Sequence, residues 1–409
     1  MPLDSMAQPT YKNKKILITQ NALVNFGGSE IVTLELAIFF KASGAEVIVY
    51  SWIFEEPIKS EFARHNIEVT TDPNDARFTE ADLIWVHHQV LPENIMRNIN
   101  DFAKNAKIIF YHMGVDTKLY LEQPYIHNLE QKIGDLSVFV SDECQKEQNK
   151  LCPGLLKNRQ AIMPNFVADE FCEKMTHPLP KKIKKICCVS NHVPKELRGV
   201  IEQLREAGVS CDIFGLHDKY AKISSEILSN YNAIITIGKT VQYGLCMGIP
   251  VYVYDHYGGP GFLNEKNYEN AKKRNFSGRG FTFKTTSEII EELKNDYTDA
   301  KDFYRVNSTK WQEEFSIKKI VDATLAACDL GEKEFITDEY INYALANLGL
   351  VSERVRLGYW SDSLYKGNLL LTREKEQLIS EKNTLLHKLS RLEKSKLLKL
   401  VRKIKHFLK

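Results

Sequence analysis

The sequence predicts two doubly wound α/β domains in series, followed by a long C-terminal helix. Short apolar runs alternate with helical segments from residue 15, and the alternation restarts beyond a Pro- and Lys-rich stretch near residue 180. After residue 369 the chain contains neither Gly nor Pro. Alternating strands and helices are typical of a parallel sheet covered by helices. A chain of 409 residues with a 43% hydrophobic share can supply two cores and an appendage.

The first α/β series is assigned to residues 1–168. A helix is expected over residues 31–44, because its apolar residues have helical periodicity and Gly44 supplies a stop. The expected strands are 16–19, 46–50, 82–86, 107–111 and 136–140.

The second series is assigned to residues 169–330, and it ends in a helical segment expected to pack back across the cleft. In such a pair of domains the ligand site lies on the loops after the strand C-termini, in the cleft. A helical elaboration is expected over 331–368 and a basic amphipathic helix over 369–409. The expected strands are 186–190, 209–215, 232–238 and 250–254.

Charge and cysteine content exclude several classes of protein. The 55 Lys and Arg nearly balance the 53 Asp and Glu and give the chain a net charge of +2. Residues 388–409 carry a net charge of +8, which leaves −6 on the rest of the chain. An acidic body with one basic end does not indicate a nucleic-acid partner. The eight cysteines form no C-x-x-C pair, and neither a secretory leader nor a membrane-spanning run is recognisable. We therefore expect a cytoplasmic protein with reduced thiols.

Glycines between the first strand and helix suggest a phosphate site. Gly27 and Gly28 precede the helix, whose N-terminal N–H groups suit an anion. An ordinary tight turn explains the same residues equally well. The segment lacks the G-x-G-x-x-G pattern, which argues against a nicotinamide dinucleotide.

Histidines follow two of the expected strands at the same sheet edge. His88 and His112, with Asp116 just beyond, are candidates for deprotonating a hydroxyl group or hydrogen-bonding a sugar. The alternative for each histidine is a bond to loop backbone. No zinc-ligand spacing occurs, so no metal site is expected.

Two loops of the second domain carry further candidates. Gly238, Lys239 and Thr240 resemble the end of a phosphate-binding P-loop, but the first glycine of that motif is absent. Thr240 is suited to cap the following helix, and Lys239 is suited to contact a diphosphate. The alternative is a solvated lysine beside a routine helix cap. The loop after residue 254 combines polar groups with glycines that permit close approach to a ligand, although a surface turn is the alternative. Its candidates are Asp255, His256, Tyr257, Gly258 and Gly259.

Residues 15–330 resemble a glycosyltransferase of the two-Rossmann (GT-B) fold, near the glycogen-synthase-like family 4. The matching segments are GGSE, VHH, YHMGVD, FVSDE, IMPNFV, DIFG and YGLCMGIPVYVYDHYGG. The resemblance implies that Gly27 and Gly28 face the donor phosphates, that His112 contacts the transferred sugar, and that Lys239 and Thr240 lie where the diphosphate binds.

The chain departs from this family at one pattern. Paired glutamates, seven residues apart, are expected before Gly248, but Tyr243 occupies the second position and no acidic residue occurs between Glu226 and Asp255. The usual Arg/Lys pair is offered by Lys195 and Arg198. Basic groups and helix N-termini would neutralise a leaving diphosphate without a metal or other cofactor.

The C-terminal segment suggests a membrane surface as a partner. Leu397, Leu400, Val401, Ile404, Phe407 and Leu408 have helical spacing among lysines and arginines, as in a helix that lies on an anionic bilayer. Similar basic tails occur in some bacterial surface-polysaccharide glycosyltransferases. An oligomerising or solvated helix is the alternative, and the spacing of Leu378, Leu385 and Leu392 leaves a homo-oligomer open.

These observations favour a cytoplasmic transferase on the inner face of the cell membrane. It would move a sugar from a nucleotide-sugar donor to a saccharide acceptor, lipid-linked, in surface polysaccharide or lipopolysaccharide synthesis. A nucleotide-sugar epimerase and a catalytically silent scaffold subunit are the alternatives.

Overall fold

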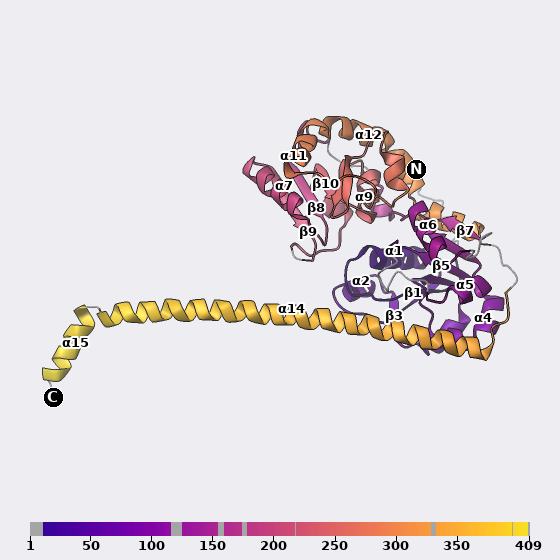
Figure 1. The fold of residues 1–409 in the computed structure, drawn as a ribbon, viewed down its shortest axis with the longest axis horizontal. Coiled ribbons are helices and arrows are strands. Elements are labelled where there is room, and N and C mark those ends of the chain that lie inside the picture. Colours follow the sequence, from indigo (N-terminus) through magenta and orange to yellow (C-terminus); the bar gives the residue numbers. More distant parts are fainter. Residues whose placement is uncertain are drawn as a thin grey trace, which may run out of the picture. The chain divides into compact units, whose positions relative to one another are not determined.

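The computed structural model describes residues 11–115, 125–153, 159–173, 178–216, 218–328, 333–394 and 396–407. The chain divides into a body that extends to Ser352 and a C-terminal unit from Glu353. Figure 1 shows the two α/β domains of the body with their labelled strands and helices.

The first domain is built on a seven-stranded sheet in which every paired strand is parallel. Its order is β3-β2-β1-β4-β5-β6-β7, so the chain reverses direction across the sheet between β1 and β4. A crevice opens at such a reversal, beyond the carboxyl ends of the strands. The strands are β1 (Lys15–Gln20), β2 (Glu46–Ser51), β3 (Glu68–Thr70), β4 (Leu83–His87), β5 (Lys107–His112), β6 (Leu136–Phe139) and β7 (Gln160–Ile162).

Helices cover this sheet and bury its apolar strands. Phe40 of α1 packs on Trp85 of β4 with ring centroids 6.0 Å apart, inside a core that the strands and α1 share. The helices are α1 (Gly28–Ala42), α2 (Ile58–Arg64), α3 (Glu93–Arg97), α4 (Ile99–Asn105), α5 (His127–Ile133) and α6 (Asp142–Leu151), with short 3-10 turns η1 (Ala76–Glu80) and η3 (Asp169–Phe171).

The second domain has a five-stranded sheet of order β12-β11-β10-β8-β9. Four strands are parallel, whereas β12 pairs antiparallel with β11. The direction reverses between β8 and β10, which places a second crevice there. The strands are β8 (Lys185–Val189), β9 (Ser210–Phe214), β10 (Ala233–Thr236), β11 (Val251–Asp255) and β12 (Gly258–Phe262).

The glycine-rich segment after residue 254 is a β-hairpin and not the open loop expected from sequence. Gly258 and Gly259 belong to β12, and a Cβ on Gly259 would overlap the carbonyl oxygen of Val253. These glycines therefore permit close packing between backbones within the hairpin.

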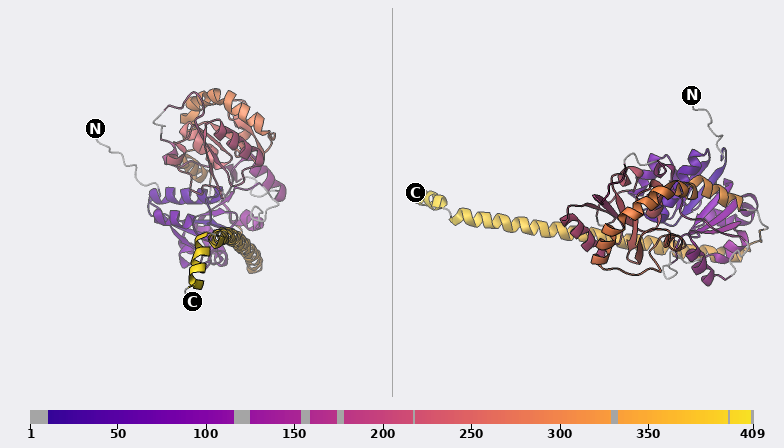
Figure 2. Two further views of the ribbon diagram at one scale, coloured as in Figure 1. Left: turned by 90° about the vertical axis from the view of Figure 1, so that its left-hand side faces the viewer. Right: turned by 90° about the horizontal axis from the view of Figure 1, so that it is seen from above.

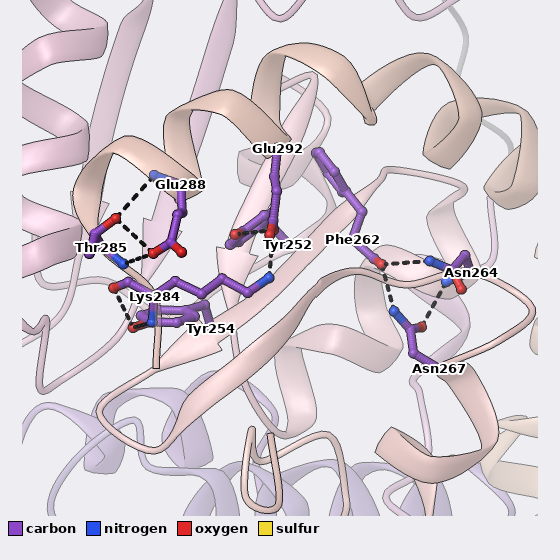
Figure 3. A network of polar contacts seen from close by, with 9 residues as sticks. All are labelled: Tyr252, Tyr254, Phe262, Asn264, Asn267, Lys284, Thr285, Glu288 and Glu292. Carbon is purple, nitrogen blue, oxygen red and sulfur yellow. Dashed lines mark hydrogen bonds and ion pairs between the residues drawn. The ribbon is translucent and has the colours of Figure 1, made fainter. Parts of the chain in front are cut away.

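A polar network holds β11 against α11 (Thr286–Asn295), as Figure 3 shows. The Tyr252 hydroxyl donates to Glu292 at 2.6 Å, and the Tyr254 hydroxyl accepts from the Lys284 N–H at 2.9 Å. This network fixes the strand whose last residue is Asp255. The domain's other helices are α7 (Lys195–Glu206), α8 (Ser225–Leu228), α9 (Lys239–Met247), α10 (Tyr268–Lys272) and α12 (Tyr297–Glu314).

The chain returns to the first domain after α12, as the sequence predicts for its segment 303–328. α13 (Ile317–Ala326) contributes Ile317, Ile320 and Val321 to the core of the first domain, and Figure 2 gives two further views of this orange segment. The Val167 N–H donates to the Phe315 carbonyl at 2.8 Å, so two chain crossings lie side by side between the domains.

The C-terminal segment begins as one helix, α14 (Asp338–Lys394), and continues as α15 (Lys396–Phe407). The helix runs through residue 369, where the sequence analysis placed a boundary. In the part of the chain that the structure describes, no helix combines the length and apolar character needed to cross a membrane.

Candidate active site

A cavity of about 420 Å³ lies between the two α/β domains, at the carboxyl ends of their strands. Both points of strand-order reversal face it, because the loops after β1, β4, β8 and β10 all contribute residues. The lining includes Phe26, Gly28, Ser29, His88, Asn165, Ser190, His192, Tyr220, Gly238, Lys239, Thr240, Tyr243, Asp255, His256 and Asn275.

Two helix N-termini open into this cavity. Gly28 and Ser29 begin α1, while Lys239 and Thr240 begin α9 behind the cap residue Gly238. Gly238 has φ +64°, a conformation that favours glycine. The first turn of each helix has N–H groups without intrahelical acceptors, and its dipole favours negative charge. The cavity therefore presents two backbone anion sites.

Glu30 shapes the loop before α1. Its carboxylate accepts hydrogen bonds from the N–H groups of Val24, Asn25 and Gly27 at 2.7–2.9 Å. Burial raises the pKa of Glu30 to about 7, against the opposing effect of these three donors. A Cβ on Gly27 would overlap this carboxylate, and the Gly27 N–H is already occupied by it.

Lys239 is held in an ion pair that joins the two domains. Its Nζ lies 2.7 Å from Oε2 of Glu35 on α1 and donates to the Phe166 carbonyl at 2.7 Å. The Tyr243 hydroxyl donates to the same Glu35 carboxylate. Burial lowers the pKa of Lys239 and raises that of Tyr243 well above its usual range. The charge of Lys239 is thus balanced by Glu35 within the protein. Tyr243, which stands where the resemblance expects a glutamate, hydrogen-bonds the same carboxylate.

His88, and not His112, is the strand-end histidine that lines the cavity. Its backbone turns at φ +51° directly after β4, and its buried Nε2 has no hydrogen-bond partner in the described chain. Burial lowers the pKa of His88 to about 4, and His112 adds to this effect. The imidazole is therefore neutral near pH 7 and suits hydrogen bonding to a ligand hydroxyl.

His112 is buried inside the first domain and is not among the lining residues. Its Nε2 lies 2.9 Å from Oε1 of Glu130, and its ring stacks on Phe139 at a centroid distance of 5.0 Å. Ser137 and Gln89 also donate to the Glu130 carboxylate. The contact with the transferred sugar that the resemblance implies for His112 thus has no support in this geometry.

A second polar cluster lies on the opposite wall. The Ser190 hydroxyl donates to Asp255 Oδ2 at 2.7 Å, and the His256 N–H donates to Oδ1 at 2.7 Å. The rings of His192 and His256 lie 5.7 Å apart. Sequence analysis named Asp255 and His256 but missed Ser190 and His192, which immediately follow β8.

An aromatic contact joins the domains at one side of the cavity. Phe26 and Tyr220 stack with centroids 5.3 Å apart, and the Tyr220 hydroxyl donates to Asn25 Oδ1 at 3.1 Å. On the lining, Asn165 Nδ2 donates to Asn275 Oδ1 at 3.1 Å. The two domains are therefore joined by polar and aromatic contacts as well as by Glu35.

Several predicted site residues lie outside the cavity lining. Arg198 pairs with Asp218 at 3.3 Å, and Lys195 is exposed at the start of α7. Tyr257 lies beneath Arg279, whose guanidinium is 5.1 Å from the ring centroid. Asp116 lies outside the described residues. The residues predicted from sequence but not on the lining are Gly27, His112, Lys195, Arg198, Tyr257, Gly258 and Gly259.

No protein-family model matches the chain, and no curated protein sequence matches it. Among solved structures, the Anabaena protein HepE in complex with UDP covers 77% of this chain and 100% of its own, with a TM-score of 0.52 and 12% identity. The chain has the GT-B fold. A glycosyltransferase from Rickettsia africae is similar over 77% of this chain and 98% of its own, with a TM-score of 0.49 and 14% identity.

The GT-B fold accounts for the position of the cavity, because its two Rossmann domains face each other with their strand C-termini toward the cleft. Membership of glycosyltransferase family 4 stays a prediction. Within the described ranges, no group of three or more His, Cys, Asp or Glu side chains is placed to hold a metal ion.

Proposed function

We propose that the chain is a glycosyltransferase that takes its sugar from a nucleotide-sugar donor bound in the interdomain cavity. The observation that carries this proposal is the convergence of two helix N-termini, those of α1 and α9, on one cavity of a GT-B fold. A nucleoside diphosphate is the leaving group of such a donor. Helix N-termini are suited to its charge.

The diphosphate is held mainly by backbone in this proposal. In the described lining, Lys239 is the one Lys or Arg, and it is already paired with Glu35. The N–H groups of Gly28, Ser29, Lys239 and Thr240 are the donors that remain for phosphate oxygens. They would stabilise the departing diphosphate as the bond to the sugar breaks, so we propose that transfer is independent of a metal.

The sugar would lie beside His88, whose neutral imidazole can hydrogen-bond a hydroxyl group. Asp255, oriented by Ser190 and by the His256 N–H, offers an acceptor on the other wall. In the transfer, the acceptor oxygen forms a bond to the anomeric carbon, the bond from that carbon to the diphosphate breaks, and the proton of the acceptor hydroxyl passes to solvent water.

We propose a saccharide acceptor at the inner face of the cell membrane, lipid-linked and used in surface polysaccharide synthesis. The basic α15 supports this location, because Leu400, Val401, Ile404 and Phe407 are exposed on a helix in which five of the twelve residues are Lys or Arg. Such a helix binds anionic lipid surfaces.

A nucleotide screen with a size-matched pair of variants, one charged and one neutral, tests the donor site. We would measure thermal stabilisation by UDP, GDP, dTDP, CDP and ADP for the full chain, for Ser29→Asp and for Ser29→Asn. An aspartate at the second position of α1 is compatible with the helix but repels a diphosphate. The asparagine has the same size and no charge.

We expect one nucleoside diphosphate to stabilise the full chain and the Ser29→Asn variant, and to lose its effect on Ser29→Asp. UDP is the first probe, since HepE was solved with it. A chain stabilised by none of the five would contradict the transferase proposal and favour a catalytically silent scaffold. Retention of the effect in Ser29→Asp would contradict the backbone site at α1.

A further inference from the structure

The C-terminal helix carries a leucine at every seventh position over seven repeats. All seven side chains are between 58% and 72% exposed. The helix is continuous through them, so that they span roughly 60 Å at 1.5 Å per residue. The leucines are Leu350, Leu357, Leu364, Leu371, Leu378, Leu385 and Leu392.

The exact period distinguishes a coiled coil from a helix that packs on a globular surface. A straight α-helix drifts by about 20° per seven residues, hence by about 120° over these six intervals. Leucines repeated strictly every seven residues face one partner only when two helices supercoil around each other. The array therefore indicates a partner that is itself a heptad helix.

Charges beside the leucines favour a second copy of the same helix. With leucine at heptad position d, Glu374 and Glu381 occupy position g, while Lys375 and Lys382 occupy position a. In a parallel, in-register pair, each a-position lysine packs beside the g-position glutamate of the other helix. In this pair Lys375 and Lys382 each meet their own equivalent at position a, the neighbouring glutamates offset that like charge, and leucine meets leucine at every d position.

The reverse orientation is disfavoured by the same residues. In an antiparallel pair each d position faces an a position, so the leucines would face mainly polar side chains such as Asn368, Lys375 and Lys382. Only the parallel, in-register arrangement places leucine against leucine throughout. A polar residue such as Asn368 at position a costs stability but fixes register and favours two strands.

We propose that residues 350–392 form a parallel, in-register, two-stranded coiled coil with the same residues of a second copy of this chain. This pairing brings the two basic α15 segments to the same end of the coiled coil. The proposal stands independently of the proposed transferase function.

Sedimentation equilibrium of the full chain, over a concentration series, tests the pairing. We expect a limiting mass of twice 47.0 kDa. The double variant Leu378→Glu/Leu385→Glu should remain near 47.0 kDa. The control Ser380→Glu/His387→Glu carries the same added charge at position f and should dimerise as the unsubstituted chain does. An unchanged thermal unfolding midpoint of the body would show that the leucine variant is folded.

Oxidative cross-linking tests orientation and register. Lys375→Cys places a thiol at an a position, where equivalent residues of two copies meet only in the parallel, in-register pair. It should form a cross-linked dimer, whereas the f-position variant Ser380→Cys and the unsubstituted chain, with its own cysteines, should not. A constant mass of 47.0 kDa across the series, or no cross-linked dimer of the Lys375→Cys variant, would overturn the proposal.

Discussion

Glu35 joins the two α/β domains through two side chains of α9. It accepts from Tyr243 and pairs with the buried Lys239, both from α9. Removing one partner of a buried ion pair leaves an uncompensated charge, a change that is strongly destabilising.

We predict that Glu35→Gln lowers the free energy of unfolding by about 3 kcal/mol, because Lys239 then stays buried without a counter-charge. Tyr243→Phe, which removes one hydrogen bond and leaves the ion pair, should lower it by only about 1 kcal/mol. Denaturant unfolding of both variants measures the difference. Equal effects would show that the ion pair does not join the domains as described.

The neutral state of His88 leads to a prediction about pH. Its pKa of about 4 in the folded chain lies below the usual 6.5, so folding favours the uncharged ring. The stabilising contribution is present above pH 6.5 and is lost as pH falls toward 4. We expect no titration of the His88 ring between pH 5 and 8 in NMR spectra of labelled histidine, assigned with His88→Gln. A midpoint near 6.5 would contradict the burial of this ring.

For single residues, the sequence predicts where a side chain lies in the fold better than which side chain it contacts. His88, Asp255 and Lys239 lie at or just after strand ends and line the cavity, because parallel strands share one carboxyl edge. Sequence alone did not reveal that Lys239 is neutralised, since its partner Glu35 lies 204 residues earlier, in the other domain. Sequence also did not reveal that His112 contacts Glu130, because that pairing depends on how α5 packs on the sheet of the same domain.

Among the elements, the N-terminal ends of α1 and α9 indicate the candidate site more directly than the glycines that precede them. The α1 and α9 starts could be predicted from an apolar strand, a glycine and a helical run. The strand β12 could not, because its sequence, Gly258–Phe262, is rich in glycine, which has low strand propensity. Its pairing follows from close backbone contact with β11.

Two glycine substitutions should distinguish the start of α1, which has room for a side chain, from the β11–β12 hairpin, which has none. Gly28→Ala meets open space at the start of α1 and should raise the free energy of unfolding by about 0.5–1 kcal/mol. Gly259→Ala meets the backbone of β11 and should lower it by at least about 2 kcal/mol. Thermal and denaturant unfolding measure both, and a tolerated Gly259→Ala would contradict the tight hairpin.

For the molecule as a whole, the proposed dimer and the proposed membrane surface are coupled. Two basic segments held at one end would bind a vesicle with greater avidity than one. From sequence the leucine period was assigned only over 378–392, because a boundary was expected at residue 369, whereas α14 runs unbroken from Asp338 to Lys394.

We therefore predict that binding to phosphatidylglycerol vesicles is weakened both by removing basic residues of α15 and by disrupting the proposed dimer. Lys399→Glu/Lys403→Glu should weaken it by about tenfold or more, since each basic residue near an anionic surface contributes about 1 kcal/mol. Leu378→Glu/Leu385→Glu should weaken it with the basic residues intact. Co-sedimentation with these vesicles, and with phosphatidylcholine vesicles as the control, measures both effects. Equal binding to the two lipids would contradict the membrane proposal.

The most direct test of the central claim is a crystal structure of the full chain with the nucleoside diphosphate that stabilises it most. The account predicts that the diphosphate oxygens accept hydrogen bonds from the first-turn N–H groups of α1 and α9, with Lys239 still paired to Glu35. A diphosphate bound instead to Lys195 and Arg198, outside the cavity, would contradict it.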